Sequence, residues 1–169
     1  MNEKEIKETK AIKVLFQKLL NDSYKQKEYR EIYTIDILPR TVKNIEKYSD
    51  FEKNILNKNS YNVLNKFILA LSKLYLYDNK IFKLSHDDEE SLSFQEYHND
   101  INRYIDDCIY NLSIPSKRMD LIFDELKIGM EISNWTIKVM DFGCTELRFV
   151  IDIFKSEGLF IRRPFFKFL

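Results

Sequence analysis

The sequence predicts a single α+β domain over residues 1–169. In this domain an N-terminal helical part of about five helices precedes a C-terminal antiparallel β-meander. Two patterns lead to this prediction. Apolar residues recur at steps of three and four as far as Leu126, and they alternate with other residues from Ile128 onward. A chain of 169 residues with 44% hydrophobic residues suits one domain with its own core.

Apolar faces predict the first three helices. The first spans residues 6–19, the second spans residues 41–56, and the third begins at Ser60 and presents Leu64, Phe67, Leu71 and Tyr75 on one face. Between the first and second helices, the β-branched and alternating "EIYTIDIL" at residues 31–38 predicts a short strand that ends at Pro39.

A capping-box pattern predicts the start of the fourth helix. In "SFQE" at residues 93–96, the Ser93 hydroxyl and the Glu96 carboxylate would each satisfy a backbone N–H group that has no partner within the helix. Apolar residues follow at helical spacing and place Cys108 on the buried face as a free thiol. Residues 116–126, after Pro115, are expected to form a short fifth helix.

Three runs of alternating residues then predict strands. The apolar positions are Ile128, Met130 and Ile132 in the first run, Trp135, Ile137 and Val139 in the second, and Leu147, Phe149, Ile151 and Ile153 in the third. A two-residue hairpin turn is predicted at Ser133 and Asn134, and a longer turn at residues 155–158.

One segment is similar to a known family. Residues 124–143, "DELKIGMEISNWTIKVMDFG", share letters with BH1 at residues 125–126, 129, 134–135 and 142–143, so the stretch resembles the BH1 segment of Bcl-2 proteins. The resemblance implies a virus-encoded protein that binds a helix in a groove. Thr136 and Ile137 stand where the family has a glycine and an arginine that pairs with the bound helix. The alternation predicts strands, whereas BH1 is helical at its end.

The sequence lacks the residue patterns of several kinds of functional site. Glycines stand only at positions 129, 143 and 158, too far apart for a phosphate-binding loop. Neither the two cysteines nor His86 and His98 have the spacing of zinc ligands, and "HDDEE" lacks the EF-hand pattern. The C-terminal "IRRPFFKFL" would suit stacking on nucleic acid, but the neutral net charge argues against it. We therefore expect no catalytic residues, no cofactor, no metal and no nucleic-acid partner.

A cytoplasmic location is expected. The N-terminal "MNEKEIKETK" has no apolar core of a signal peptide, and no run reaches the roughly 18 apolar residues of a membrane span. Two cysteines do not make a disulfide framework. Abundant Lys, Asn, Ile, Phe and Tyr indicate an AT-rich genome, whether bacterial, phage or viral.

Charge is unevenly distributed in a chain whose net charge is zero. Residues 1–83 carry 17 basic and 11 acidic side chains, residues 84–107 carry 1 and 8, and residues 108–169 carry 9 and 8. The middle stretch therefore creates a local negative field. Seven of its carboxylates are the predicted partner-binding residues: Asp87, Asp88, Glu89, Glu90, Glu96, Asp100 and Asp107.

The acidic stretch predicts a non-enzymatic protein-binding protein. Nucleases present positively charged active sites to phosphates, and an acidic surface can occupy such sites with electrostatic acceleration of the encounter. Our first hypothesis is an inhibitor or immunity-type protein that neutralises a basic toxin or nuclease. The alternatives are a virus- or phage-encoded host-interaction protein, including the Bcl-2-like groove binder, and an enzyme whose site residues have no recognisable pattern.

Overall fold

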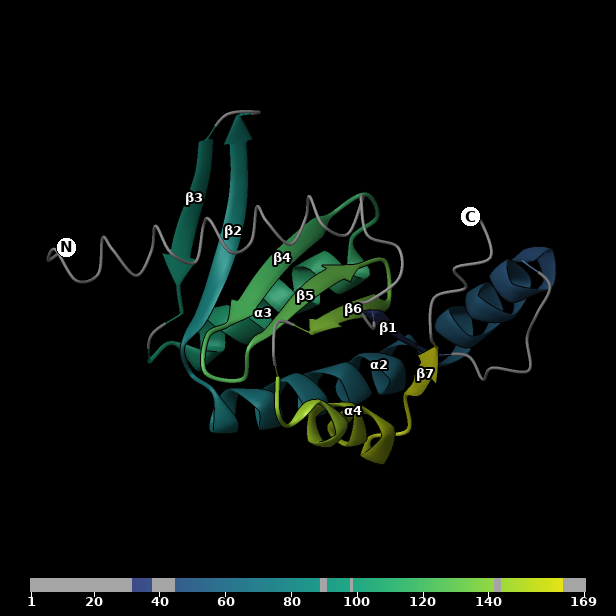
Figure 1. Ribbon diagram of the computed structural model, residues 1–169. Helices are drawn as coiled ribbons and strands as arrows, with labels where there is room; N and C mark the ends of the chain where they lie inside the picture. Colours follow the sequence, from purple (N-terminus) through teal and green to yellow (C-terminus); the bar gives the residue numbers. More distant parts are fainter. Residues whose placement is uncertain (1–31, 38–44, 89–90, 98, 142–143, 163–169) are drawn as a thin grey trace, which may run out of the picture.

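The computed structural model describes residues 32–37, 45–88, 91–97, 99–141 and 144–162. Within these residues, seven strands form one antiparallel sheet in the order β3-β2-β4-β5-β6-β1-β7 (Figure 1). The strands are β1 (Ile32–Asp36), β2 (Ile81–Asp88), β3 (Ser91–Glu96), β4 (Arg118–Phe123), β5 (Ile128–Ser133), β6 (Thr136–Asp141) and β7 (Phe160–Arg162). The helices in the same residues are α2 (Ile45–Tyr77), α3 (Ile101–Ser113) and α4 (Leu147–Ser156).

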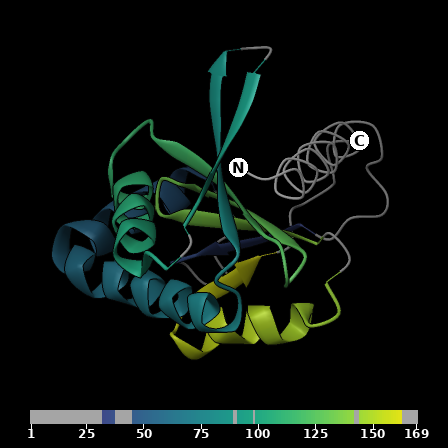
Figure 2. The ribbon, with the colours of Figure 1, turned by 90° about the vertical axis from the view of Figure 1, so that its left-hand side faces the viewer.

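Helices α2 and α3 lie on the same side of the sheet, as the turned view in Figure 2 shows. α4 packs beside α2 and against β7. The core lies between these helices and the sheet. It is formed by inward-facing strand residues, such as Met119, Leu121 and Phe123 of β4, and by the buried stripe of α2 that includes Phe67, Leu71 and Leu74. Among the described residues, no helix combines the length and the apolar content that a membrane crossing requires.

The predicted order of elements, about five helices followed by a β-meander, is wrong. Strands β2, β3 and β4 occupy the part that was expected to be helical, and α4 interrupts the part that was expected to be strands. The strand predicted at residues 31–38 is confirmed as β1. The helix predicted at residues 6–19 lies outside the described residues.

α2 is one helix of 33 residues where the sequence predicted two. The second predicted helix ended at residue 56 and the third began at Ser60, but weak helix formers such as Asn and Ser cost only tenths of a kcal/mol each when packing supports the helix. Here Ile55 and Leu56 pack against the core before the gap, and the buried stripe runs from Val63 through Leu74 after it. Tertiary packing therefore overrides the local composition.

The capping box predicted at Ser93 is also wrong. Ser93 lies in β3, opposite Ser85 of β2. α3 begins at Ile101, and the Asp100 carboxylate caps it by accepting a hydrogen bond from the backbone N–H of Arg103 at 3.0 Å. Asp100 therefore has a structural role at the helix start.

The fifth helix, predicted at residues 116–126, is replaced by β4. Every residue of β4 after Arg118 is buried. The alternation of Arg118, Met119, Asp120 and Leu121 ends in the apolar run from Leu121 to Phe123, because both faces of the strand are buried there. A period of two is therefore visible over only four residues, which is too short to identify the strand.

The third predicted strand is helix α4. The alternation fails at Val150 and Phe154, whereas the polar residues Arg148, Asp152 and Lys155 recur at steps of four and three, so a period of 3.6 fits this run better than a period of two. The helix ends in a Schellman motif, in which Gly158 N–H donates to the Lys155 carbonyl (3.0 Å) and Leu159 N–H donates to the Phe154 carbonyl (3.2 Å). Gly158 adopts φ +83°, which only glycine reaches without strain.

The hairpin of β5 and β6 confirms the first two predicted strands. Asn134 and Trp135 form its turn, with φ 43° and 60°, as a type I′ turn requires. The turn lies one residue later than predicted. Because residues 128–141 form two strands, the segment that resembles BH1 is not a helix, and this finding overturns the fold that the resemblance implied.

Ion pairs join β4, β5 and β6 on the face of the sheet that does not form the core with the helices. Arg118 reaches Asp120 at 3.5 Å and Glu131 at 3.3 Å, and Lys138 reaches Glu131 at 3.7 Å. These pairs explain why β5 and β6 alternate so clearly in sequence, since their second face is polar. Both cysteines are free, and Cys108 is buried in α3, as predicted.

A buried carboxylate joins the end of α2 to the turn between β4 and β5. Asp78 is fully buried, and it accepts three backbone hydrogen bonds at 2.9 Å, from Lys80, Glu125 and Leu126. The helix and the turn are 47 residues apart in sequence. This carboxylate therefore fixes the position of one end of the sheet relative to α2.

We predict that Asp78→Ala lowers the free energy of unfolding by about 2–4 kcal/mol, because three N–H groups lose their acceptor. Urea denaturation measures this loss. Asp124→Ala in the same turn is the matched control. The Asp124 carboxylate pairs with exposed Lys127, so its removal should cost less than about 1 kcal/mol. Equal losses in the two variants would show that the Asp78 hydrogen bonds do not stabilise the fold.

We also predict that the free energy of unfolding depends on pH through the Asp78 carboxyl. Burial raises the pKa of this carboxyl above its ordinary 3.8, against the opposing effect of its backbone hydrogen bonds. The folded state then binds the proton more tightly than the unfolded state, so the contribution of Asp78 to the unfolding free energy falls as pH rises from about 4 through the folded-state pKa. In Asp78→Asn this component should disappear from the stability profile. An unchanged profile would contradict the raised pKa.

Candidate functional site

The outer part of the β2–β3 hairpin extends beyond the rest of the sheet. β4 pairs with β2 only from Ile81 to Leu84, whereas β3 continues to pair with β2 as far as Asp88. Residues 85–88 and 91–93 therefore leave the sheet as a two-stranded ribbon, and Figure 1 shows this ribbon projecting from the body. We call the sequence segment 85–93 the acidic arm. The register shifts between His86 and Asp88, close to the outer end of the arm.

The seven predicted partner-binding residues fall into two groups. Asp87 and Asp88 lie at the outer end of β2, and Glu89 and Glu90, which follow them, lie outside the described residues. The other three residues, Glu96, Asp100 and Asp107, lie at the base of the arm or on α3. Glu96 pairs with Phe82 at the base of the hairpin, and Asp88 pairs with Ser91 near its outer end. The two pairs are roughly 20 Å apart along the strand. The structure therefore does not bring all seven carboxylates into one patch.

Tyr97 anchors the base of the arm. It follows β3 directly and is fully buried, and its backbone N–H donates to the Ile81 carbonyl at 3.0 Å. Its hydroxyl donates to the Asp107 carboxylate of α3 at 2.5 Å. Burial, and next the hydrogen bond to Asp107, raise the pKa of the Tyr97 phenol far above its usual value, so this group is a neutral donor.

A cluster of aromatic rings continues this anchor into the core. Tyr104 is buried between Tyr97 and Phe123, with ring centroids at 5.7 and 6.4 Å. Its hydroxyl donates to the Leu71 carbonyl of α2 at 3.0 Å, and the Tyr75 hydroxyl donates to the Tyr97 carbonyl at 3.2 Å. The arm is thus fixed to both α2 and α3 at its base.

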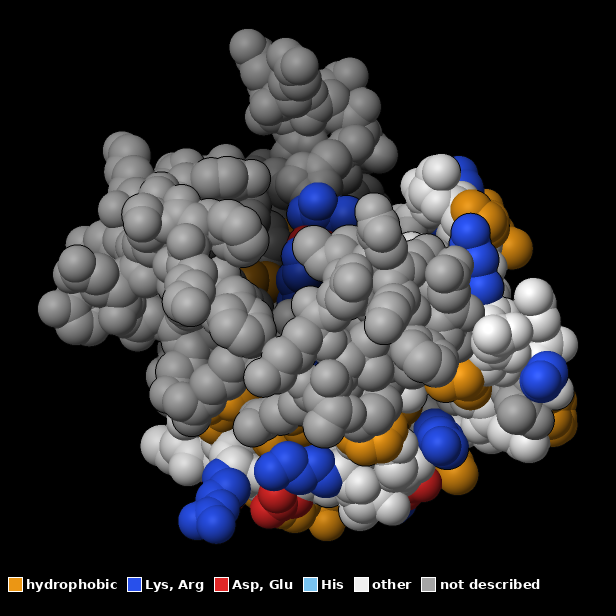
Figure 3. Space-filling model, turned by 90° about the vertical axis from the view of Figure 1, so that its right-hand side faces the viewer, with side chains coloured by type: hydrophobic (Ala, Val, Ile, Leu, Met, Phe, Trp, Pro, Cys, Tyr) orange, Lys and Arg blue, Asp and Glu red, His pale blue; other side chains and the backbone are white. Residues whose placement is uncertain are grey.

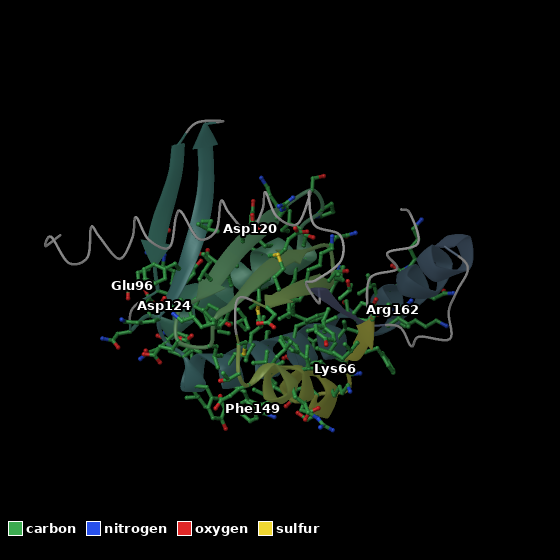
Figure 4. All side chains as sticks on the ribbon, in the orientation of Figure 1. Lys66, Glu96, Asp120, Asp124, Phe149 and Arg162 are labelled. Atoms are coloured by element: carbon green, nitrogen blue, oxygen red, sulfur yellow. The ribbon has the colours of Figure 1, made fainter. Side chains whose placement is uncertain are left out.

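Asp107 has a second partner on the arm side. The Lys83 ammonium lies 3.5 Å from its carboxylate, and both side chains are about one-quarter exposed. The Asp107 carboxylate is therefore bound within the fold, by a hydrogen bond from Tyr97 and an ion pair with Lys83. Of the three carboxylates at the base, Glu96 is exposed and faces solvent near Asp124 (Figure 4), and Asp100 caps α3. This division of roles reduces the predicted site to the arm and its exposed surroundings.

The described residues offer little for nucleophilic or metal chemistry. No group of three His, Cys, Asp or Glu residues within them could hold a metal ion. Burial raises the pKa of both the Cys108 and the Cys144 thiols, which disfavours the reactive thiolate. The description of the structure does not include the His86 side chain or His98.

Sequence reasoning missed the anchor residues Lys83, Tyr97 and Tyr104. Tyr97 and Tyr104 were assigned to one apolar helix face, whereas the helix begins between them. The signal that could have separated them is Asn99-Asp100, because such residues favour turns and N-caps. A helix start at Asp100 would have left residues 91–96 free to be a strand.

Comparisons of this chain with protein-family models, with curated proteins and with solved structures found no match.

We predict that Tyr97→Phe lowers the free energy of unfolding by about 1–3 kcal/mol, because the Asp107 carboxylate loses a buried donor. It should also speed amide exchange at the base of the arm, at residues 82–84 and 95–97. Tyr110→Phe is the matched control, since the Tyr110 side chain is half exposed on α3, the helix that carries Asp107. If exchange at the arm base is as slow in Tyr97→Phe as in the control, Tyr97 does not anchor the arm.

Proposed function

We propose that this chain is a non-enzymatic, cytoplasmic protein-binding protein of the inhibitor or immunity type. In this proposal it neutralises a basic toxin or nuclease, and the acidic arm makes the main contact. The observation that supports the proposal is the arm itself, a ribbon that leaves the sheet at Leu84 and carries Asp87 and Asp88 at its outer end. Glu89 and Glu90 follow in the sequence.

A two-stranded ribbon without a third strand is only marginally stable in water, so a chain that maintains one has a reason beyond its own stability. In addition, four consecutive carboxylates create a local negative field, which favours contact with positive charge. A basic cleft in a partner would cover the ribbon and neutralise its charge.

The anchor at the base fits this role. Tyr97, Tyr104 and Asp107 hold the arm to the body, so little orientational freedom is lost when a partner binds. Opposite charges mainly accelerate the encounter of two proteins, and salt screens this acceleration. The expected signature is a fast association that slows at high ionic strength.

The sequence leads us to expect that Asp87, Asp88, Glu89 and Glu90 are solvated charges, which contribute little to stability, so we predict that replacing them with Asn or Gln leaves the melting temperature nearly unchanged. Association with the basic protein that co-purifies from native lysate should slow about tenfold or more at low salt. The partner would be identified by mass spectrometry and its association rate measured by stopped flow.

The control variant neutralises four exposed carboxylates elsewhere, at Asp106, Glu125, Glu146 and Asp152. It changes the net charge by the same amount but leaves the arm intact, so its association rate should stay close to that of the wild type. Equal slowing in both variants would mean that net charge alone steers the encounter. No slowing in the arm variant would remove the main support for the proposal.

A further inference from the structure

The sheet ends in two edge strands that differ in kind. Figure 1 shows β7 at one end of the sheet and β3 at the other. β7 has three residues, and its last residue, Arg162, is followed by Arg163 and Pro164 in the sequence. Short length, basic side chains and a nearby proline are common features that keep an edge from pairing with another chain. The β7 edge therefore has the character of an edge protected from further pairing.

β3 has none of these protective features. It is six residues long, and its sequence "SLSFQE" contains neither lysine nor proline. The register shift of the hairpin lies in β2, between His86 and Asp88, so it does not interrupt the outer edge of β3. Among the described residues β3 pairs with β2 alone. In this part of the chain, the outer edge of β3 is therefore open to a further strand.

The backbone hydrogen bonds show which groups face this outer edge. The Tyr97 N–H donates to the Ile81 carbonyl at 3.0 Å, and the register of the hairpin, continued by one pair, places these two residues opposite each other. In an antiparallel pair of strands, opposite residues alternate between those that exchange hydrogen bonds and those that do not. The N–H and carbonyl groups of Leu92 and Phe94 therefore point away from β2, towards the outer edge.

The charge beside this edge has one sign. Residues 84–97 carry five carboxylates and neither lysine nor arginine, and Lys83, just before them, is paired with Asp107. Asp88 is paired with Ser91, so the acidic end of β2 lies next to the start of the edge. On the side of the molecule where β7 lies, Figure 3 shows more Lys and Arg than Asp and Glu side chains among the described residues. A strand with basic side chains is therefore favoured at β3.

The same charge argues against a second copy of this chain at the edge. Antiparallel pairing of β3 with itself would bring Ser91 of one copy opposite Glu96 of the other. The carboxylates at the outer end of each hairpin would then lie beside the Glu96 carboxylate of the other copy, and like charges on neighbouring strands are destabilising. Parallel pairing would place the two acidic ends side by side. A basic strand meets no such repulsion.

We propose that the outer edge of β3 takes an extended segment of the basic partner as an additional strand of the sheet. This inference rests on the proposed function, because it names how the partner binds the acidic arm. The backbone groups of Leu92 and Phe94 would exchange hydrogen bonds with the added strand, and its Lys or Arg side chains would lie near Asp87 and Asp88. The added strand would also turn the marginal two-stranded ribbon into a three-stranded sheet.

The first test uses the wild-type chain and three synthetic peptides of about eight residues, which is within the usual length of a strand. One peptide alternates Lys and Val, and the second carries Glu in place of Lys. The third is the Lys peptide with N-methylated central residues, so that neither of its edges can donate hydrogen bonds. Fluorescence anisotropy should show that the Lys peptide binds at least about tenfold more tightly than either of the others, with an affinity that falls as salt rises. The proposal is overturned if the Lys peptide does not bind, or if either of the other peptides binds equally well.

The second test replaces Phe94. Phe94→Pro removes an N–H group that points away from β2, at a position where an edge strand tolerates proline, so the pairing of β2 with β3 keeps its hydrogen bonds. It should weaken binding of the Lys peptide about tenfold or more. Phe94→Ala is the matched control, because it loses the same ring but keeps the N–H group, and its affinity should stay close to that of the wild type. Equal affinities of the two variants would contradict the proposal. The melting temperature checks that Phe94→Pro is folded, and the peptide comparison on the wild type does not depend on this variant.

The co-purified partner separates this inference from the function on which it rests. If neutralising Asp87, Asp88, Glu89 and Glu90 slows association but Phe94→Pro binds the partner with the wild-type affinity, the proposed function stands and the added strand is overturned. If neutralisation leaves association unchanged, the proposed function fails, although the peptides can still show that β3 takes a basic strand. Sedimentation that shows a wild-type dimer, and its dissociation by Phe94→Pro, would overturn the inference in favour of a second copy at the edge.

Discussion

The hydrogen bond from the Tyr97 hydroxyl to the Asp107 carboxylate determines how the projecting arm is held. It joins Tyr97, which follows β3 directly, to the middle of α3, and it lies at the level of Ile81, where β3, β2 and β4 still pair side by side. A buried phenol needs an acceptor, and a partly buried carboxylate needs a donor, so the two groups satisfy each other. Tyr104 and Tyr75 extend this contact to α2, which makes the base of the arm part of the core. A two-stranded ribbon can then project into solvent without losing its orientation.

The division of the acidic stretch into two groups follows from this anchor. Asp107 and Asp100 are engaged within the fold, one by Tyr97 and Lys83 and the other by the first turn of α3. The carboxylates that the proposed partner would contact are those of the acidic arm.

The sequence predicted the elements whose periodicity is unambiguous. β1, β5 and β6 have one buried face and one polar face, so their alternation is visible, and the buried position of Cys108 followed from the apolar stripe of α3. β4 is buried at every position after Arg118 and ends in an apolar run, so its period is weak. In α4 the polar residues Arg148, Asp152 and Lys155 recur at helical steps, and together with the C-terminal Gly158 they distinguish this helix from the strand that was predicted. The candidate site was predictable as an acidic stretch, but its geometry was not, because the pairing of β2 with both β3 and β4 depends on contacts between residues distant in sequence.

The most direct test of the acidic arm as the partner surface is hydrogen–deuterium exchange of this chain, alone and in complex with its co-purified basic partner. Amides that become protected in the complex report where the partner makes contact. If the arm makes the main contact, exchange should slow at residues 85–93 and stay unchanged in α2 and α4. Protection confined to α2 and α4, with the arm exchanging as fast as in the free protein, would contradict this account.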